Sequence, residues 1–241
     1  MTLHSSFLSR LSALLVLAWL GASPLGSAFA APAAETSPDV HAHHQQSARS
    51  LEDIEHSEFN HRVAGMGMLF MGLLALGMEA GIARRPNLHA MLWLWPAGWI
   101  VLGVFLFMRN DPHNWPWGPI SLMDTLSAPD TLQHQIFTVV VMTIGTIEGL
   151  QVSGRLSGHR WRFFFPVLGI GSGLLLGLHA QVHALTPHVY LQHMVMAVLA
   201  TSLGTCKLLR ERGTLQGWYG SLLWPVLMML LGAQLFFYVE H

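Results

Sequence analysis

Residues 62–83 read RVAGMGMLFMGLLALGMEAGIA, a run that carries charge only at Arg62 and Glu79. A helix of about 20 apolar residues crosses the roughly 30 Å hydrocarbon core of a bilayer. Five further apolar segments of similar length follow, at about 90–108, 135–154, 164–182, 194–209 and 219–238. The sequence therefore predicts an all-α membrane protein, a bundle of six transmembrane helices in contact with the lipid bilayer.

The composition agrees with a membrane protein. Of the 241 residues 52% are hydrophobic and 10% are charged, whereas soluble domains carry about 25% charged residues. The net charge of -1 gives no basic surface for nucleic acid. The single cysteine excludes an internal disulfide. We find no nucleophile motif, no HExxH motif and no catalytic triad, so we do not expect an enzyme.

The first thirty residues have the pattern of a secretory signal peptide. Arg10 precedes a short apolar core at residues 11–20, and Ala28-Phe29-Ala30 is a typical cleavage site. An uncleaved membrane anchor is the alternative. Residues 31–57 are polar and predict a disordered, histidine-containing periplasmic linker, with at most one short surface helix capped at Ser50.

Basic residues are distributed unevenly between the two sides of the predicted bundle. The joints between segments one and two, three and four, and five and six hold Arg84, Arg85, Arg155, Arg160, Arg162, Lys207, Arg210 and Arg212. The other side of the mature chain holds only Arg49, Arg62 and Arg109. The positive-inside rule therefore places those joints in the cytoplasm and both termini in the periplasm of a bacterium, with the bundle in the inner membrane.

The six segments show a threefold repeat. An apolar-amide-histidine triplet precedes segments one, three and five, and ends at His61, His134 and His193. The even segments are expected to begin at Trp95-Pro96, Phe165-Pro166 and Trp224-Pro225, which lie 35, 32 and 32 residues after those histidines. We interpret residues 58–241 as three helical hairpins, at about 58–130, 131–190 and 191–241. The alternative is that any hairpin can begin with a polar residue and a proline.

Most of the histidines fall on the predicted outer side. If the three hairpins pack around one axis, His61, His134 and His193 converge at equal depth. Imidazole is the commonest metal-ligating side chain, so this ring predicts a metal site. Four residues near the outer ends of the even helices are candidates to complete it: His179, His183, His113 and Asp111. The linker histidines predicted to capture the metal are His41, His43 and His44.

Methionines near these histidines favour copper. Met66 follows His61 by five residues and Met196 follows His193 by three. Thioethers suit Cu(I), and imidazole suits several metals including copper. The alternative is that the methionines only fill gaps in the core. Glu79 and Glu148, in the inner half of helices one and three, either pair with Arg84, Arg85 or Arg155 or face the bundle interior.

Three short stretches resemble a known family. Residues 107–119 read FMRNDPHNWPWGP, residues 132–137 read LQHQIF, and residues 57–62 read SEFNHR. They resemble the membrane region of bacterial proteins of the copper-resistance protein D family, over about residues 57–241. The resemblance implies copper handling in the inner membrane. This chain has fewer helices than is usual for that family, and the proposed ligands are not carried over from it.

Three functions remain open at this stage. The first is a copper-handling protein in copper resistance, uptake or delivery, with a periplasmic copper chaperone as partner. The second is a membrane b-type cytochrome, in which histidines bind haem. The third is a metal-free membrane scaffold or assembly factor.

Overall fold

A computed structural model describes residues 50–82, 90–111, 113, 115–127, 129–182 and 186–240. The predicted signal peptide, residues 31–49 of the predicted linker, and the histidines at positions 41, 43 and 44 lie outside these ranges. The described part belongs to one compact unit that begins at Arg49.

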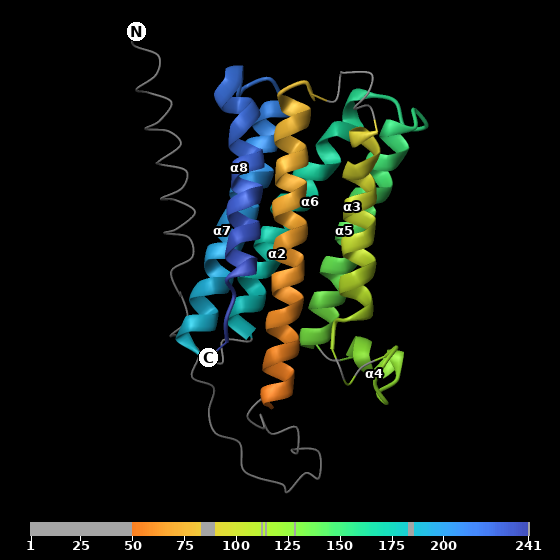
Figure 1. Ribbon diagram of the computed structural model, residues 1–241, viewed down its shortest axis with the longest axis vertical. Coiled ribbons are helices and arrows are strands. Elements are labelled where there is room, and N and C mark those ends of the chain that lie inside the picture. Colours follow the sequence, from red (N-terminus) through yellow and green to blue (C-terminus); the bar gives the residue numbers. More distant parts are fainter. Residues whose placement is uncertain are drawn as a thin grey trace, which may run out of the picture. The chain divides into compact units, whose positions relative to one another are not determined.

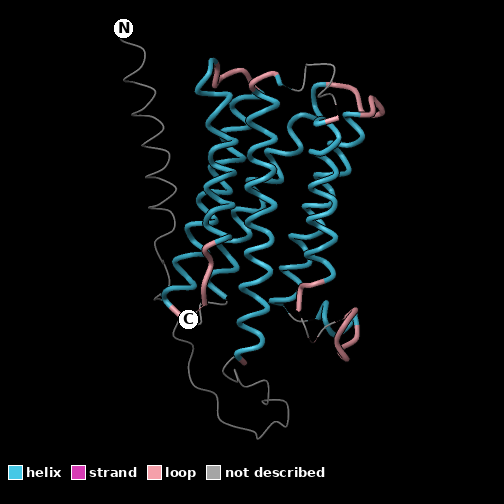
Figure 2. The backbone as a smooth tube through the Cα atoms, viewed as in Figure 1, coloured by secondary structure: helices cyan, strands magenta, loops and turns pink. Residues whose placement is uncertain are grey.

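The architecture is all-helical, with no strand among the described residues (Figures 1 and 2). In the described part of the chain six elements are long and apolar enough to cross a membrane, which agrees with the predicted number. They are α2 (Leu51–Glu79), α3 (Met91–Met108), α5 (Pro129–Val152), α6 (Phe164–Val182), α7 (Pro187–Glu211) and α8 (Gly217–Phe236). A six-residue helix α4 (Leu122–Ser127), which the sequence did not predict, and a 3-10 turn η3 (His159–Phe163) lie between them.

The helices run alternately up and down, so the bundle has two distinct ends (Figure 1). We call the lower end in this view the His end, because α2, α5 and α7 begin there and carry His61, His134 and His193. We call the opposite end the Arg end, because Arg155, Arg160, Arg162, Arg210 and Arg212 lie there.

Helix α2 begins earlier than the sequence predicted. Ser50 caps it: its Oγ accepts a hydrogen bond from the backbone N–H of Asp53, whose carboxylate accepts one from the N–H of Ser50. This capping box satisfies two backbone donors that a helix start otherwise leaves unpaired. Residues 51–57 are therefore helical rather than linker, and the predicted short surface helix is the first part of one 29-residue helix. His61 consequently lies in the third turn and not at the helix start.

Two of the three predicted helix starts at proline are also wrong. Pro166 lies in the first turn of α6, but Pro96 and Pro225 lie inside α3 and α8. Proline is tolerated within a membrane helix when neighbouring helices compensate for the lost backbone bond. Each proline carbonyl here lies against a glycine of an adjacent helix.

Three helix pairs pack most closely: α2 with α8, α3 with α5, and α6 with α7. Glycines make these approaches possible, because a Cβ would collide with the facing backbone. A Cβ on Gly204 would lie 2.7 Å from the carbonyl oxygen of Pro166, and one on Gly145 would lie 2.9 Å from that of Pro96. Gly72 faces Pro225 in the same way, at 3.3 Å. Small residues of this kind allow helices to associate in lipid, where no hydrophobic force draws them together.

Two groups of buried side chains fill the bundle. The larger group contains a triangle of aromatic rings, Trp95, Phe165 and Trp224, whose centroids lie 5.7 to 6.1 Å apart. The smaller group contains Met196, Ala200, Leu231 and Tyr238. Met68 packs against both groups and so connects them.

Candidate metal-binding site at the His end

His61 and His193 are oriented in the same way by their own helices. The Nδ1–H of His61 donates to the carbonyl oxygen of Ser57 at 2.8 Å, and that of His193 donates to Val189 at 2.9 Å. A carbonyl only accepts hydrogen bonds, so each Nδ1 carries a proton, and in the neutral tautomer the lone pair is then on Nε2. Metal-binding histidines are commonly oriented by such a bond from the other ring nitrogen.

The two imidazoles lie next to each other and against Tyr238. The ring centroids of His61 and His193 are 6.3 Å apart at 77°. The Tyr238 ring stacks on His61 at 3.9 Å and lies edge-on to His193 at 5.7 Å. His193 and Tyr238 are almost fully buried, at 6% and 1% exposure. The stacked Tyr238 ring covers one face of the His61 ring. A metal binds a ring nitrogen in the plane of the ring, and stacking on the face does not occupy that direction.

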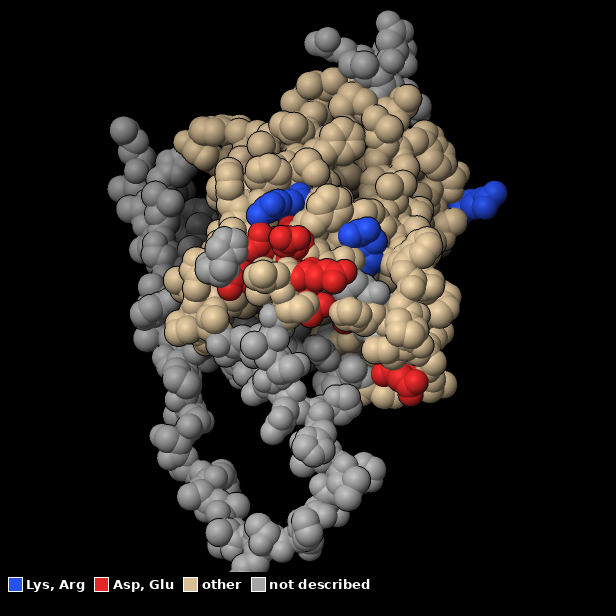
Figure 3. All heavy atoms as spheres, turned by 60° about the horizontal axis from the view of Figure 1, so that its bottom comes forward, with Lys and Arg blue, Asp and Glu red and all other residues tan. Residues whose placement is uncertain are grey.

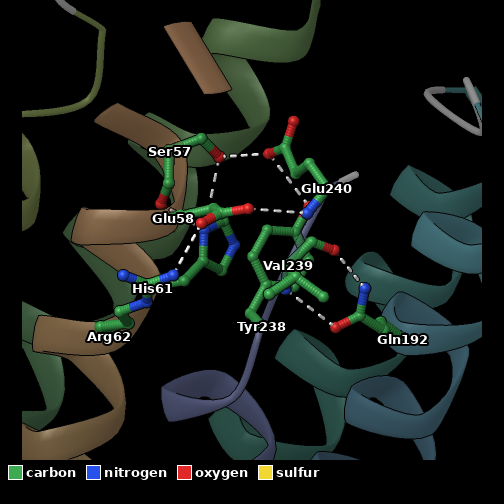
Figure 4. Close-up of polar contacts among 8 residues, drawn as sticks. All are labelled: Ser57, Glu58, His61, Arg62, Gln192, Tyr238, Val239 and Glu240. Atoms are coloured by element: carbon green, nitrogen blue, oxygen red, sulfur yellow. Dashed lines mark hydrogen bonds and ion pairs between the residues drawn. The ribbon is translucent and has the colours of Figure 1, made fainter. Parts of the chain in front are cut away.

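The segment after α8 is held beside His61 by several hydrogen bonds (Figure 4). Gln192 donates to the carbonyl of Val239 at 2.6 Å and accepts from its N–H at 3.3 Å. The N–H of Glu240 donates to Glu58 at 3.0 Å. Ser57 and the Tyr238 hydroxyl both donate to the Glu240 carboxylate. These bonds fix the position of Tyr238 and place two carboxylates beside the imidazoles.

Acidic side chains gather at the centre of the His end, with basic ones beside them (Figure 3). Glu58 is 5% exposed and pairs with Arg62 at 2.7 Å. The Glu58–Arg62 ion pair forms part of the wall of an open depression. This depression is lined by Glu52, Glu55, His56, Glu58, Phe59, Arg62 and Arg109. Three glutamates against two arginines in this depression favour a cation over an anion there.

The two predicted methionine ligands have opposite environments. Met196 is 1% exposed and belongs to the same buried group as Tyr238. Met66 is 51% exposed on the outer surface of α2, so it is not part of this buried group. The reason is helical geometry: Met66 follows His61 by five residues and points to another face, whereas Met68, at seven residues, shares the face of His61.

The predicted ring of three histidines is not formed. Among the described residues, which include His61, His134 and His193, no group of three His, Cys, Asp or Glu side chains is arranged to hold a metal ion. The packing is less symmetric than a threefold ring requires, because α7 contacts α8 more extensively than α2 contacts α3 or α5 contacts α6. The pair of His61 and His193 is what remains of the ring.

His113 and Asp111 lie in a separate polar group. The Asp111 carboxylate accepts the backbone N–H of His113 at 2.7 Å, and the His113 ring contacts Asp53 at 3.0 Å. These residues link the segment after α3 to the first turn of α2. Position 183 and the side chain at position 179, the other predicted ligands, lie outside the described residues.

Glu79 and Glu148 lie at the Arg end and are partly buried. Glu79 accepts from the Trp224 indole at 3.0 Å and from Arg210 at 3.3 Å, and Lys207 lies 3.9 Å away. Glu148 accepts from the Trp95 indole at 3.0 Å. Both carboxylates thus contact the aromatic triangle from the Arg end. The cations that pair with Glu79 belong to α7, and Arg155 is not one of them.

Sequence reasoning missed Tyr238, Gln192 and Glu58 as parts of the site. The repeated amide before each histidine was the available signal: Asn60 bonds the carbonyl of Arg109, just as Gln192 bonds that of Val239. The amide therefore links α2 to the end of α3 in the first hairpin, and α7 to the segment after α8 in the third.

No family profile, curated protein or solved structure matches this chain. The functional argument consequently rests on the geometry of the site.

Proposed function

We propose that the chain is a copper-handling membrane protein that binds a copper ion with His61 and His193. The observation that carries the proposal is the pair of adjacent imidazoles with Nδ1 committed to backbone carbonyls. This arrangement fixes the tautomer before any ion arrives, which lowers the cost of ordering the ligands.

The remaining donors fit copper better than zinc. Met196 and Met68 are the thioethers of the neighbouring buried group, and thioether with imidazole suits Cu(I). Zinc sites favour thiolate, imidazole and carboxylate ligands. The lone cysteine, Cys206, belongs to the larger buried group with the aromatic triangle and not to the group around Tyr238. We assign copper as the cargo and leave its oxidation state to experiment.

The proposal includes an orientation. Basic residues concentrate at the Arg end, so the positive-inside rule puts that end in the cytoplasm and the His end in the periplasm of a bacterial inner membrane. The linker histidines would then capture copper on the same side, and a periplasmic chaperone would deliver or receive it there. The resemblance to the copper-resistance protein D family supports the same side and cargo.

We also propose that the bundle is built from three repeated hairpins. The support is that the glycines and prolines at the closest helix contacts recur at the same spacings in all three hairpins. Gly72, Gly145 and Gly204 each follow a triplet histidine by eleven residues, and each faces the carbonyl of a proline. Gly103, Gly173 and Gly232 each follow such a proline by seven residues. In this register Glu79 and Glu148 do not occupy equivalent positions, being seven and three residues after their glycines.

The proposal is tested by titrating the purified full-length protein with Cu(I) against a chromophoric Cu(I) chelator under reducing conditions. We expect one tightly bound ion per chain. The double variant H61A/H193A should weaken binding by at least about a hundredfold. The matched control is H159A, because His159 is exposed at the Arg end. Wild-type affinity in H61A/H193A would refute the site.

Methionine ligation has its own matched pair of variants. M196L should weaken Cu(I) binding because it removes a buried sulfur, whereas M66L should not, because Met66 is half exposed. An absorption spectrum of the same preparation separates the other functions. A Soret band would favour the b-type cytochrome, and protein with neither metal nor haem would favour the scaffold.

A further inference from the structure

The segment between α3 and α5 exposes an unusual amount of apolar surface. Trp117 is 71% exposed and Met123 is 74% exposed. Four further large apolar side chains of this segment are about two-fifths exposed: Trp115, Ile120, Leu122 and Leu126. A contiguous exposed apolar patch on a soluble surface marks a binding site. We call residues 115–127 the apolar ledge.

The apolar ledge is folded and has a fixed orientation. The backbone N–H of Ile120 donates to the carbonyl of His113, and Trp115 packs edge-on against Phe107 of α3 at 6.0 Å. Thr125 of α4 is 1% exposed, so this face of the short helix is directed into the protein. Met123 and Leu126 lie on other faces of the helix and are exposed.

The hydroxyl groups of the ledge are satisfied within the ledge itself. Ser121 donates to the Asp124 carboxylate at 2.6 Å. Thr125 donates to the carbonyl of Ser121, and Ser127 donates to that of Met123, both at 2.9 Å. Internal satisfaction of polar groups is what a segment needs in order to enter a medium that offers few hydrogen bonds.

We infer that the apolar ledge lies in the interfacial region of the bilayer at the His end and anchors the bundle in that leaflet. Two observations favour lipid as its partner. The ledge is continuous with the lipid-facing surfaces of the two helices that it joins, where Val104 of α3 and Ile136 of α5 are exposed. Trp is the residue type enriched at membrane interfaces.

The charge of the segment specifies which lipid contacts it makes. No lysine or arginine occurs between Arg109 and Arg155, whereas Asp111, Asp124 and Asp130 do. Adsorption through anionic headgroups requires cations, so the ledge binds by burying apolar side chains among zwitterionic lipids. The start of α2 at the same end differs, because its exposed residues include Glu52 and Glu55.

The test uses the full chain in phosphatidylcholine vesicles. In a C206A background, a polarity-sensitive fluorophore is attached to M123C or, separately, to W117C. The matched control is E55C, at an exposed acidic position of the same end. Quenching is then compared between brominated lipid and aqueous iodide.

We expect the probes at 117 and 123 to be quenched by brominated lipid and to be at least about fivefold less sensitive to iodide than the probe at 55. Iodide quenching at 117 and 123 equal to that at 55 would overturn the inference. Energy transfer between labelled chains without quenching by lipid would also overturn it, because a second copy of the protein would then cover the ledge. Neither readout involves copper, so the result is independent of the proposed function.

Discussion

The His end and the Arg end both bury polar side chains, but their polar groups find different partners. At the Arg end, Glu79 is compensated by Arg210 and Lys207 and also accepts an indole N–H. At the His end, His61 and His193 each donate Nδ1–H to a carbonyl of their own helix, and a proton on Nδ1 puts the lone pair of the neutral tautomer on Nε2. Polar groups therefore stabilise the fold at the Arg end, whereas at the His end they orient the two imidazoles that we propose as copper ligands.

The largest expected effect concerns the charges of the Arg end. E79Q keeps a hydrogen-bond acceptor for Trp224 but removes the negative charge that faces Arg210 and Lys207. We expect a loss of about 3 kcal/mol in the free energy of unfolding, because the partly buried Arg210 loses its carboxylate partner and Lys207 keeps only Glu211. Thermal unfolding in detergent measures the effect. The control is E55Q, an exposed change at the His end that should stay within about 0.5 kcal/mol.

An unfolding midpoint of E79Q equal to that of E55Q would show that the pairing at the Arg end contributes little to stability. The contrast between the two ends would then be lost. Copper affinity of the folded E79Q protein should equal that of the wild type, since Glu79 lies at the Arg end and the imidazoles lie at the His end.

The next effect concerns the close helix approaches between the two ends. G204A should destabilise the protein by about 1–3 kcal/mol, because the new Cβ would lie 2.6 Å from the backbone nitrogen of Ile170. G171A is the matched control, since a Cβ there meets nothing within 4 Å. The same thermal measurement applies. If G204A is as stable as G171A, α6 and α7 can move apart without a loss of stability, and Gly204 does not set the distance between them.

The smallest effect concerns the hydrogen bonds that hold the segment after α8 at the His end. Q192L removes both hydrogen bonds to Val239 and should cost about 1–2 kcal/mol. The loss is local, so hydrogen exchange at the Val239 amide should accelerate and Cu(I) affinity should fall as Tyr238 becomes less fixed. The control is Q216L, which removes one exposed bond to Gly213 at the Arg end. Unchanged exchange at Val239 in Q192L would show that other contacts hold this segment.

The sequence predicted the helices better than their ends. Six apolar segments specify six spans, and the bounds of α6 agree with the prediction. The start of α2 was placed too late because its first turns are polar, and only the capping box at Ser50 extends the helix through them. Pro96 and Pro225 were expected to begin helices, yet neighbouring helices allow them inside one.

The candidate site was predicted in part. The pair of His61 and His193 follows from their equivalent positions in the repeated triplet, and the helical face distinguishes Met196 from Met66. The exclusion of His134 depends on unequal packing between the hairpins, which no local pattern encodes. Tyr238 reaches the site because the chain turns back after α8 and is bonded by Gln192, a contact between residues far apart in the sequence.

The most direct measurement is X-ray absorption at the copper edge of the protein loaded with one equivalent of Cu(I). The account predicts scattering from two imidazole rings and a sulfur shell, with loss of sulfur in M196L and loss of imidazole in H61A/H193A. Imidazole scattering that persists unchanged in H61A/H193A would contradict it, because the copper would then be bound somewhere other than the histidine pair.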